Sequence, residues 1–318
     1  MYAYNLAEGV AELPNILIAS QTSRRDVPTP SGFATVSTSF LNSFIMKISI
    51  ITACFNSGGT LRDTMRSVLS QSFADWEHII VDGNSKDDTV DIIRELEPEY
   101  EDRLKWVSEP DRGIYDAMNK GLDMATGDVI GILNSDDFFS GPEVLERINA
   151  ELESGRIDAV YGDIHFVESA RLNDCARYYS SRFFHPWMMI FGYQPAHPSF
   201  YCRRKCYKKF GGFDISFRVA ADFENMLRLI YINRIKIRYI PLDFVTMRTG
   251  GASTKGLASH VQILMDHYRA YKKNGVTKGY CFDLMRYPLK LGELMLSRTM
   301  PRLYGGKAIK GHESVPNA

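Results

Sequence analysis

The chain has 318 residues, enough for one large α/β domain with a substantial core or for two smaller domains. Its 38 basic and 38 acidic residues cancel, which argues against a protein held to nucleic acid by its overall charge. A hydrophobic content of 45% is ordinary for a soluble globular protein. The sequence contains no apolar run of the roughly 18 residues that span a bilayer.

The two ends of the chain differ from the middle. Residues 1–45 are rich in Ser, Thr, Pro and Ala without a sustained period, so we expect an N-terminal extension with little fixed structure. Residues 266–318 form a basic amphipathic tail. Between His267 and Lys310 ten Lys or Arg face two acids, a net charge of +8. Two interpretations stay open: peripheral contact with an anionic membrane, or a solvated face whose leucines pack on the preceding domain.

The five cysteines are scattered and lack zinc-ligand spacing, so we expect reduced thiols in a cytoplasmic protein.

From Met46 onward, apolar strands alternate with amphipathic helices. We expect strands at residues 48–53, 76–81, 104–107, 129–133 and 157–161. We expect helices at residues 60–70, 89–96 and 114–124, and another that begins at Pro142. This alternation predicts right-handed βαβ units and a mainly parallel sheet flanked by helices. The later part is less regular, with helices expected at 223–231 and 260–273 and a strand at 235–240.

Polar residues follow each of the first four strands, at 54–56, 82–85, 109–112 and 134–137. Any one of these groups could be a helix cap. Because ligands of open parallel sheets bind outside the carboxyl ends of the strands, four such groups together favour a binding crevice.

Asp136 and Asp137 form the sharpest local feature. Two adjacent carboxylates repel each other unless a cation or strong donors are near, and Mg²⁺ or Mn²⁺ prefers such oxygen ligands. The competing interpretation is an exposed turn, which the apolar strand before the pair disfavours.

A dinucleotide-binding oxidoreductase needs Gly-x-Gly-x-x-Gly after the first strand. The segment 54–59 reads Cys-Phe-Asn-Ser-Gly-Gly, so its glycine spacing does not fit. A Walker-type phosphate loop is also absent from the sequence.

The order of several motifs resembles glycosyltransferase family 2, over about residues 46 to 250. The motifs are Ile-Ser-Ile-Ile-Thr-Ala-Cys-Phe-Asn at 48–56, Ile-Val-Asp-Gly-Asn-Ser at 80–85, Gly-Ile-Tyr-Asp-Ala-Met-Asn at 113–119, Ala-Thr-Gly-Asp at 125–128 and Asn-Ser-Asp-Asp at 134–137. The third is similar to the subset that builds bacterial exopolysaccharides such as colanic acid and O-antigen-like chains. Asn134 departs from the family pattern, in which an acid usually stands there.

The resemblance implies a Rossmann-like GT-A fold, a nucleotide-diphosphate sugar donor, expected to be a UDP-sugar, and Mg²⁺ or Mn²⁺ held by Asp137. The residues expected to bind donor or acceptor are Thr52, Asn56, Asp82, Arg112, Asn119, Asp136 and His197. Asp222 is the expected general base of an inverting transfer, with Glu224 as the second candidate. Asp222 could instead serve only as a helix cap, and His197 could be structural.

These expectations divide the chain into an extension at 1–45, a catalytic domain at 46–265 and the tail at 266–318. Within the domain, 46–140 is the nucleotide-sugar half and 141–265 the acceptor half. The predicted function is transfer of a sugar to a hydroxyl of a glycan or lipid-linked acceptor in cell-surface polysaccharide biosynthesis. The alternatives are a nucleotidyltransferase and an inactive nucleotide-sugar-binding module of the same fold.

Overall fold

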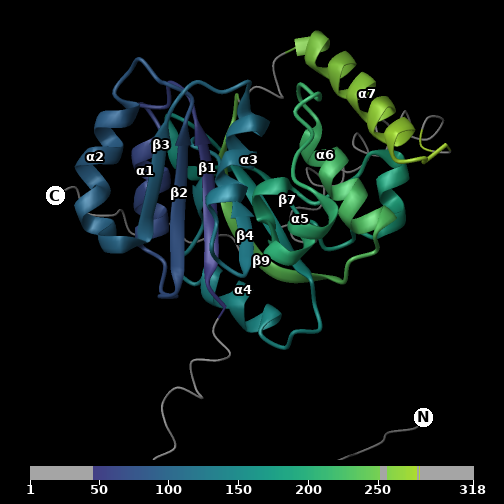
Figure 1. Cartoon of the computed structure of the whole chain (residues 1–318), viewed down its shortest axis with the longest axis horizontal. Helices are drawn as coiled ribbons and strands as arrows, with labels where there is room; N and C mark the ends of the chain where they lie inside the picture. The colour runs from purple at the N-terminus through teal and green to yellow at the C-terminus, as the bar shows by residue number, and fades with distance from the viewer. Residues whose placement is uncertain (1–45, 251–255, 278, 280–318) are drawn as a thin grey trace, which may run out of the picture. The chain divides into compact units, whose positions relative to one another are not determined.

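The computed structural model describes residues 46–250, 256–277 and 279, all of which belong to the compact unit Phe44–Ala318 (Figure 1). The predictions for residues 1–45, and those for residues 280–318 of the tail, fall outside the described residues.

A nine-stranded sheet forms the centre of this unit, in the order β3-β2-β1-β4-β8-β6-β9-β5, with β7 paired to β6. The strands are β1 Ile48–Cys54, β2 Trp76–Asp82, β3 Leu104–Ser108, β4 Val129–Ile132, β5 Phe138–Phe139, β6 Ala159–Glu168, β7 Arg171–Tyr179, β8 Phe200–Arg203 and β9 Ile237–Arg248. Strands β3, β2, β1 and β4 run parallel, as predicted. β8 is antiparallel to both neighbours, so the second half of the sheet is mixed.

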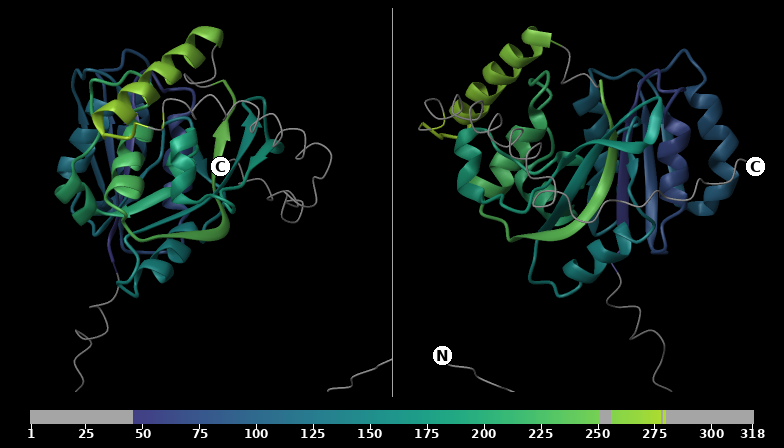
Figure 2. Two further views of the ribbon diagram at one scale, coloured as in Figure 1. Left: turned by 90° about the vertical axis from the view of Figure 1, so that its right-hand side faces the viewer. Right: turned by 180° about the vertical axis from the view of Figure 1, so that it is seen from behind.

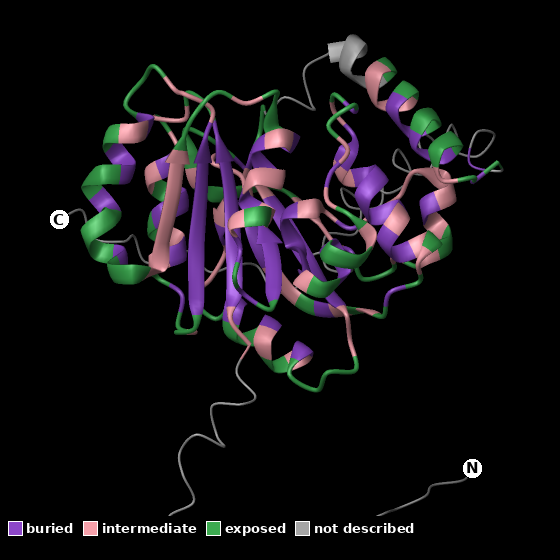
Figure 3. Cartoon of the chain, viewed as in Figure 1, coloured by how far each residue is buried: buried purple, intermediate pink, exposed green. Residues whose placement is uncertain are grey.

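Helices cover both faces of the sheet (Figure 2). On one face α1 Leu61–Leu69, α2 Thr89–Tyr100 and α4 Val144–Leu152 contribute to a hydrophobic cluster with Ile48 and Ile50. On the other face α3 Ile114–Met124, α5 Arg204–Phe210, α6 Ala221–Met226 and the π-helical segment η5 Leu227–Ile232 pack with Ile51. The alternation of β1 side chains between the two clusters follows from the period of two in a strand. Both faces of β1, β2 and β4 are therefore buried (Figure 3).

The remaining elements are the short 3₁₀ segments η2 Glu101–Arg103, η3 Pro186–Phe191 and η4 His197–Ser199, and helix α7 Gly256–Lys273. Tyr271 of α7 is buried and donates a hydrogen bond to the Met189 carbonyl of η3 at 2.8 Å. Ala270 and Tyr271 join the same cluster as α6, so the start of the predicted tail, through Lys273, is packed on the domain.

Every strand and helix predicted before residue 141 is present, with ends shifted by up to four residues. Helix α2 continues through Pro98 because Leu96 and Tyr100 both pack into the core. The helix expected to begin at Pro142 begins instead at Val144. The structure adds β5, β7, β8 and α5, which were not predicted. The middle of β7 is exposed and irregularly paired, so its sequence lacks the apolar alternation of a half-buried strand.

Glu77 holds together the amino ends of the parallel strands. Its buried carboxylate accepts hydrogen bonds from Ser49 Oγ at 2.6 Å, from Thr126 N at 2.6 Å and from Lys105 Nζ at 2.8 Å. Gly127 is required beside it, because a Cβ there would lie 2.7 Å from the Lys47 carbonyl oxygen. The Ala-Thr-Gly-Asp motif thus fixes the turn into β4.

Candidate active site

The parallel strands β1, β2 and β4 have their carboxyl ends side by side. Cys54 pairs with Asp82 across β1 and β2, and Ile51 pairs with Ile132 across β1 and β4. The polar segments after these strands therefore meet at the same place, as the sequence pattern predicts. Ser57 Oγ and Ser135 Oγ, which follow β1 and β4, lie 2.8 Å apart.

Asp82 at the end of β2 is buried and organises the loop that follows it. Its carboxylate accepts hydrogen bonds from the Ser85 backbone N–H at 3.0 Å, from the Ser85 hydroxyl and from Ser108 Oγ at 2.6 Å. Cys54 Sγ lies 3.8 Å from Asp82 Oδ1. Burial is the main reason that the pKa of this thiol is far above its ordinary value, and the Asp82 carboxylate is the second. Asp82 therefore ties the loop after β2 to the end of β3.

Asn56 joins the loops after β1 and β2. It has a positive φ of 51°, a conformation that asparagine tolerates better than most residues. Its Oδ1 accepts a hydrogen bond from Lys86 N at 2.9 Å, and its own N–H donates to Ser85 Oγ at 2.7 Å. The side chain is exposed beyond the carboxyl end of β1, where a nucleotide could contact it.

Thr52 and Asn119 make internal contacts. Thr52 has no exposed surface, and its hydroxyl donates to the Leu133 carbonyl oxygen at 2.8 Å, which ties β1 to the segment after β4. The Asn119 amide makes both of its contacts with the backbone of Phe213, donating to O at 2.7 Å and accepting from N at 2.8 Å. Asn119 thereby connects α3 to the loop before α6.

Arg112 precedes α3, and its side chain is 73% exposed. It forms an ion pair of 2.9 Å with Asp116, one helical turn away. Because the guanidinium is held only by this exposed contact, it is available to an anionic ligand at the crevice.

The Asn134–Asp137 segment carries two different carboxylates. Asp137 is 1% exposed, and its Oδ2 accepts a hydrogen bond of 2.8 Å from Asn134 Nδ2. Its Oδ1 is buried without a partner. Burial, and then the neighbouring Asp136, raises the pKa of Asp137 well above its ordinary range. Asn134 therefore donates to a carboxylate where an acid in its place would repel it.

This donor set fits a divalent cation. An unpartnered buried carboxylate oxygen on Asp137, with the Asp136 carboxylate beside it, is an arrangement that a cation would stabilise. Among the described residues no group of three or more His, Cys, Asp or Glu side chains is placed to hold a metal. Mg²⁺ and Mn²⁺ are commonly bound by one or two carboxylates together with substrate phosphates and water, so a small protein donor set is consistent with such a site.

Arg248, at the end of β9, contacts the Asn134–Asp137 segment. Its Nη1 donates to the Asp136 carbonyl oxygen at 2.6 Å, and its Nη2 is paired with Asp63 of α1. Its side chain is 6% exposed, and the guanidinium lies 5.1 Å from the centre of the Phe138 ring. The Asn134–Asp137 segment, called the acidic turn below, is thus fixed between α1 and β9.

Asp222 lies in the first turn of α6 and is held by residues from other elements. Gln194 Nε2 donates to Asp222 Oδ2 at 3.0 Å, and the Tyr115 hydroxyl lies 3.4 Å from Asp222 Oδ1. His197 Nδ1 is 3.8 Å from Asp222 Oδ2. The helix is preceded by Ala220 and has no side-chain cap, so the carboxylate of Asp222 does not serve as one.

His197 stands between Asp222 and the acidic turn. Burial lowers the pKa of His197 below its ordinary value, although the carboxylates of Asp222 and Asp136 oppose this effect. Its Nε2 is buried without a partner. A small cavity of about 10 Å³ borders His197, Asp222 and Asn225, with room for about one water molecule. His197 and Asp222 therefore border one cavity, and His197 is also within electrostatic reach of Asp136.

Glu224 points elsewhere. It is completely buried, and its carboxylate accepts hydrogen bonds from Arg228 at 3.2 Å and from Asn274 at 3.1 Å. Burial alone would raise its pKa, but these donors and Lys273 lower it overall. Every contact of Glu224 is structural, which leaves Asp222 as the better placed of the two acids.

The family model of glycosyl transferase family 2 matches residues 49–209, about half of the chain. This protein belongs to glycosyltransferase family 2. A relative described as an uncharacterized glycosyltransferase of Mycobacterium tuberculosis (strain CDC 1551 / Oshkosh) is 34% identical over 207 residues, which are 64% of this chain and 76% of the relative. A PGL/p-HBAD biosynthesis glycosyltransferase of Mycobacterium bovis (strain BCG / Pasteur 1173P2) is 30% identical over 193 residues, 60% of this chain and 73% of that protein.

Solved structures confirm the GT-A fold of this family 2 glycosyltransferase. S. aureus TarS in complex with UDP-GlcNAc superposes with a TM-score of 0.56 at 18% identity, over 70% of this chain and 66% of the other, just under two thirds of its length. Mannosyltransferase PcManGT from Pyrobaculum calidifontis, in complex with GDP-Man and Mn²⁺, has a TM-score of 0.56 at 16% identity over 83% and 77% of the two chains.

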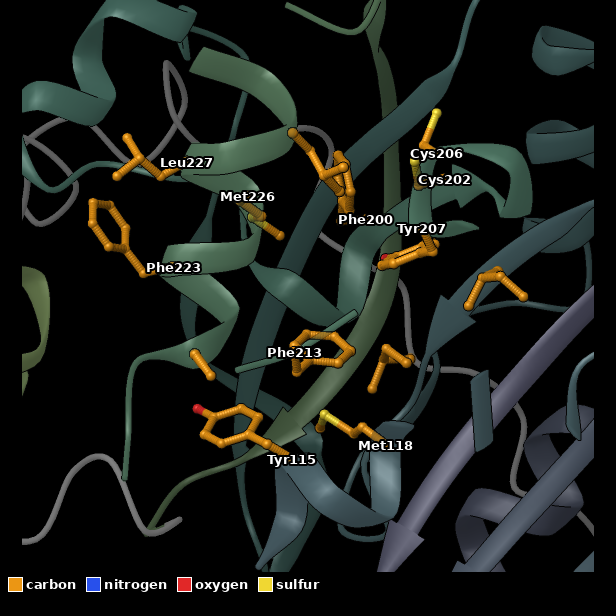
Figure 4. Close-up of a cluster of buried hydrophobic side chains, with 14 of the residues drawn as sticks. Tyr115, Met118, Phe200, Cys202, Cys206, Tyr207, Phe213, Phe223, Met226 and Leu227 are labelled. Atoms are coloured by element: carbon orange, nitrogen blue, oxygen red, sulfur yellow. The ribbon is translucent and has the colours of Figure 1, made fainter. Parts of the chain in front are cut away.

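Three residues of this glycosyltransferase site were not predicted: Gln194, Arg248 and Tyr115. Tyr115 stands inside the Gly-Ile-Tyr-Asp-Ala-Met-Asn motif, but no pattern in the sequence indicates that it meets α6. Figure 4 shows Tyr115 beside Phe213, and their ring centres are 6.0 Å apart. Arg248 would have been a candidate if the strand expected at 235–240 had been extended to its true end, because charged residues at strand carboxyl ends bind ligands in such sheets.

Proposed function

We propose that this family 2 enzyme is an inverting, metal-assisted glycosyltransferase that uses a nucleotide-diphosphate sugar, specifically a UDP-sugar. The observation that carries the proposal is the position of Asp222. This carboxylate of the acceptor half is held by Gln194 and Tyr115 and adjoins His197, whose pKa is also influenced by Asp136 of the donor half. These contacts support a role for this carboxylate in acting on an acceptor hydroxyl between the two halves.

The donor nucleotide would lie over the carboxyl ends of β1 and β2. Asn56 and Arg112 offer exposed polar groups there, Asp82 fixes the loop that would contact the base, and Thr52 and Asn119 hold the supporting strands and helix. Uracil has an N–H that a carboxylate can accept, which is our reason for favouring a UDP-sugar. The S. aureus TarS structure contains UDP-GlcNAc and the PcManGT structure contains GDP-Man, so both nucleotides need to be tested.

Asp137, with Asp136 beside it, would hold Mg²⁺ or Mn²⁺ through the oxygen that now lacks a partner. When bound, such a cation neutralises charge that develops on a departing diphosphate. The Mn²⁺ in the PcManGT structure supports a divalent cation in enzymes of this fold.

Asp222 would accept the proton of the acceptor hydroxyl as that oxygen attacks the anomeric carbon from the face opposite the diphosphate. Gln194 and Tyr115 would orient the carboxylate. Burial lowers the pKa of His197, and its imidazole would contact the donor diphosphate or the acceptor by a hydrogen bond.

The acceptor we propose is a glycan or lipid-linked hydroxyl in cell-surface polysaccharide biosynthesis. The relative named for PGL/p-HBAD biosynthesis supports a cell-surface product. No helix in the described ranges is both long enough and apolar enough to cross a membrane. We propose, from the excess of Lys and Arg in the tail sequence, that residues 280–318 contact an anionic membrane. Removing them should weaken binding to anionic vesicles, and equal binding without them would reject this role.

A transfer assay tests the proposed activity. The enzyme is supplied with UDP- or GDP-sugars, with and without Mn²⁺, and released nucleoside diphosphate is measured beside the Asp222→Asn variant. Release that depends on Mn²⁺ and is lost in the variant supports the proposal. Pyrophosphate release would instead indicate a nucleotidyltransferase. Donor binding in a thermal-shift assay without any turnover would indicate an inactive module.

A further inference from the structure

A large groove, separate from the small cavity beside His197, lies in the acceptor half on the same face of the sheet as α6. It is a groove of about 870 Å³ between β6, the segment 184–187, the end of η5 and the start of β9. Its walls are aromatic and aliphatic, with Tyr161, Phe184, Trp187 and Tyr231 among the lining residues. None of the predicted donor, acceptor or metal residues borders it, so the proposed reaction gives it no role.

Large apolar side chains stand exposed at and beside this groove. Trp187 is 53% exposed and Ile232 is 40% exposed, and both line it. Phe183, which precedes the lining residue Phe184, is 70% exposed. This is the largest exposure among the large hydrophobic side chains of the described residues. Clustered exposed aromatics at one groove mark an interaction surface, whereas single exposed apolar residues do not.

Two of the chain segments that line the groove carry basic residues and no acids. The segments 180–187 and 229–238 contain no Asp or Glu. Arg182 and Arg234 are exposed and form no ion pair with any described residue, while Arg238 is paired with Glu151 at 2.7 Å. Arg234 lines the groove, and the Arg182 guanidinium lies 5.8 Å from the centre of the Phe183 ring, so both add positive charge beside the aromatic side chains.

The groove is held firmly, and the basic tail begins near it. Tyr271 of α7 donates to the Met189 carbonyl oxygen, two residues after Trp187. Gly279 packs so closely on Tyr271 that an added Cβ would lie 2.6 Å from its ring. Gly279 therefore lies against α7, and the sequence after it carries a net positive charge.

We propose that this aromatic groove, with Phe183, Arg182 and Arg234 at its edge, is a docking surface for an anionic lipid bilayer. Tryptophan and phenylalanine partition into the interfacial region of a bilayer, and arginines beside them attract anionic headgroups. A second copy of the chain would bring like positive charges together, and the segment after Gly279 is also positive, so both are disfavoured as occupants. This inference deepens the peripheral membrane contact of the proposed function and rests on it.

The test uses the full chain and vesicles of phosphatidylcholine with or without phosphatidylglycerol. Two double variants remove the features separately: Phe183→Ala with Trp187→Ala, and Arg182→Gln with Arg234→Gln. The matched control is Arg147→Gln with Arg156→Gln. Both arginines are exposed, and neither forms an ion pair with a described residue. Arg147 lies in α4 and Arg156 follows it, and α4 packs on the other face of the sheet. We expect each groove variant to bind phosphatidylglycerol vesicles at least about tenfold more weakly, and the control to lose less than the arginine variant.

Trp187 itself provides a second measurement. Its emission should shift to the blue on phosphatidylglycerol vesicles and be quenched by brominated lipid, after subtraction of the signal of Trp187→Phe. Vesicle binding that is unchanged in both groove variants would overturn the inference. So would a concentration-dependent dimer, measured by light scattering, that the Phe183 and Trp187 variant abolishes.

Turnover with a water-soluble acceptor is measured in parallel, because it reports on the transferase and not on the groove. Loss of vesicle binding in the groove variants with this turnover intact supports the docking surface. Absence of turnover in every variant and in the unaltered protein would reject the proposed function while leaving the vesicle result to stand by itself.

Discussion

The Gln194 amide donates from Nε2 to Asp222 Oδ2 at 3.0 Å, and its own Oε1 is buried without a partner. A buried amide with one unsatisfied oxygen is costly, and a single bond to a carboxylate repays little of that cost. We therefore expect Gln194 to orient the Asp222 carboxylate and to contribute little to the free energy of unfolding.

Replacing the two acids of α6 should give opposite results. Asp222→Asn should lower the transfer rate by about 10²-fold or more, because the proton acceptor is removed, while donor affinity stays near that of the unaltered enzyme. Glu224→Gln should mainly lower thermal stability, because it breaks a buried ion pair with Arg228. Rates and melting temperatures measured on both variants decide the assignment. A Glu224 variant that folds normally but is inactive would reverse it.

Tyr115→Phe should act through Asp222. The variant keeps the ring beside Phe213 but loses the hydroxyl contacts with Asp222 and with the Val219 carbonyl. A lost hydrogen bond of about 0.5–1.5 kcal/mol corresponds to a rate about 2- to 13-fold lower. Calorimetry should show an unchanged donor affinity. If donor affinity falls while the rate at saturation is retained, Tyr115 serves the nucleotide and does not position the base.

Asp137→Asn should separate stability from metal binding. Burial penalises the charged carboxylate, so the neutral amide should leave the metal-free protein equally or more stable in thermal unfolding. The stabilisation that Mn²⁺ gives the unaltered enzyme should disappear, together with metal-dependent transfer. Wild-type turnover in this variant would show that the metal assignment is wrong.

Asp82→Ala should weaken donor binding and also loosen the rim of the crevice. The substitution leaves Ser85 and Ser108 without their acceptor, at about 1–3 kcal/mol for each donor that stays buried. Binding of a uridine nucleotide, measured by calorimetry below the melting temperature, should fall. An unchanged affinity would remove Asp82 from the nucleotide site.

Acid should destabilise the protein partly through Glu77. Burial alone would raise the pKa of Glu77, but hydrogen bonds from Lys105, Ser49 and Thr126 lower it far below its ordinary value. The group therefore stabilises the fold above about pH 4.5, and this stabilisation is lost as the pH falls toward the lowered pKa. Glu77→Gln should cost about 3 kcal/mol at neutral pH and flatten the acid limb of the stability profile in denaturant unfolding. A parallel downward shift of the whole profile would contradict this origin.

The part of the domain before residue 141 was readable from the sequence because its signals are local. The apolar β1 and the amphipathic α3 each have the period of their element, and polar residues follow the strands directly. The acceptor half depends on pairings between distant segments. The sequence of β8 alone does not show that it runs antiparallel between β4 and β6, and Arg248 reaches the acidic turn only because β9 is twice as long as its most apolar stretch suggests.

The same limit applies to the site. Asp136, Asp137 and Asp222 could be named as candidates because acids are conspicuous at strand and helix ends. Their partners Gln194 and Tyr115 could not, because an amide or a tyrosine carries no signal of its role until the chain brings it to a carboxylate.

Helix α3 touches both halves of the enzyme, through Asn119 on the Phe213 backbone and Tyr115 on Val219 and Asp222. This has a consequence for engineering hybrids. If the residues after 141 were exchanged between relatives, Asp222 of one protein would pack against α3 of the other. Hybrids that carry α3 with the acceptor half, or that keep residues 113–119 and 211–222 from one parent, should retain turnover where a simple exchange at the boundary loses it.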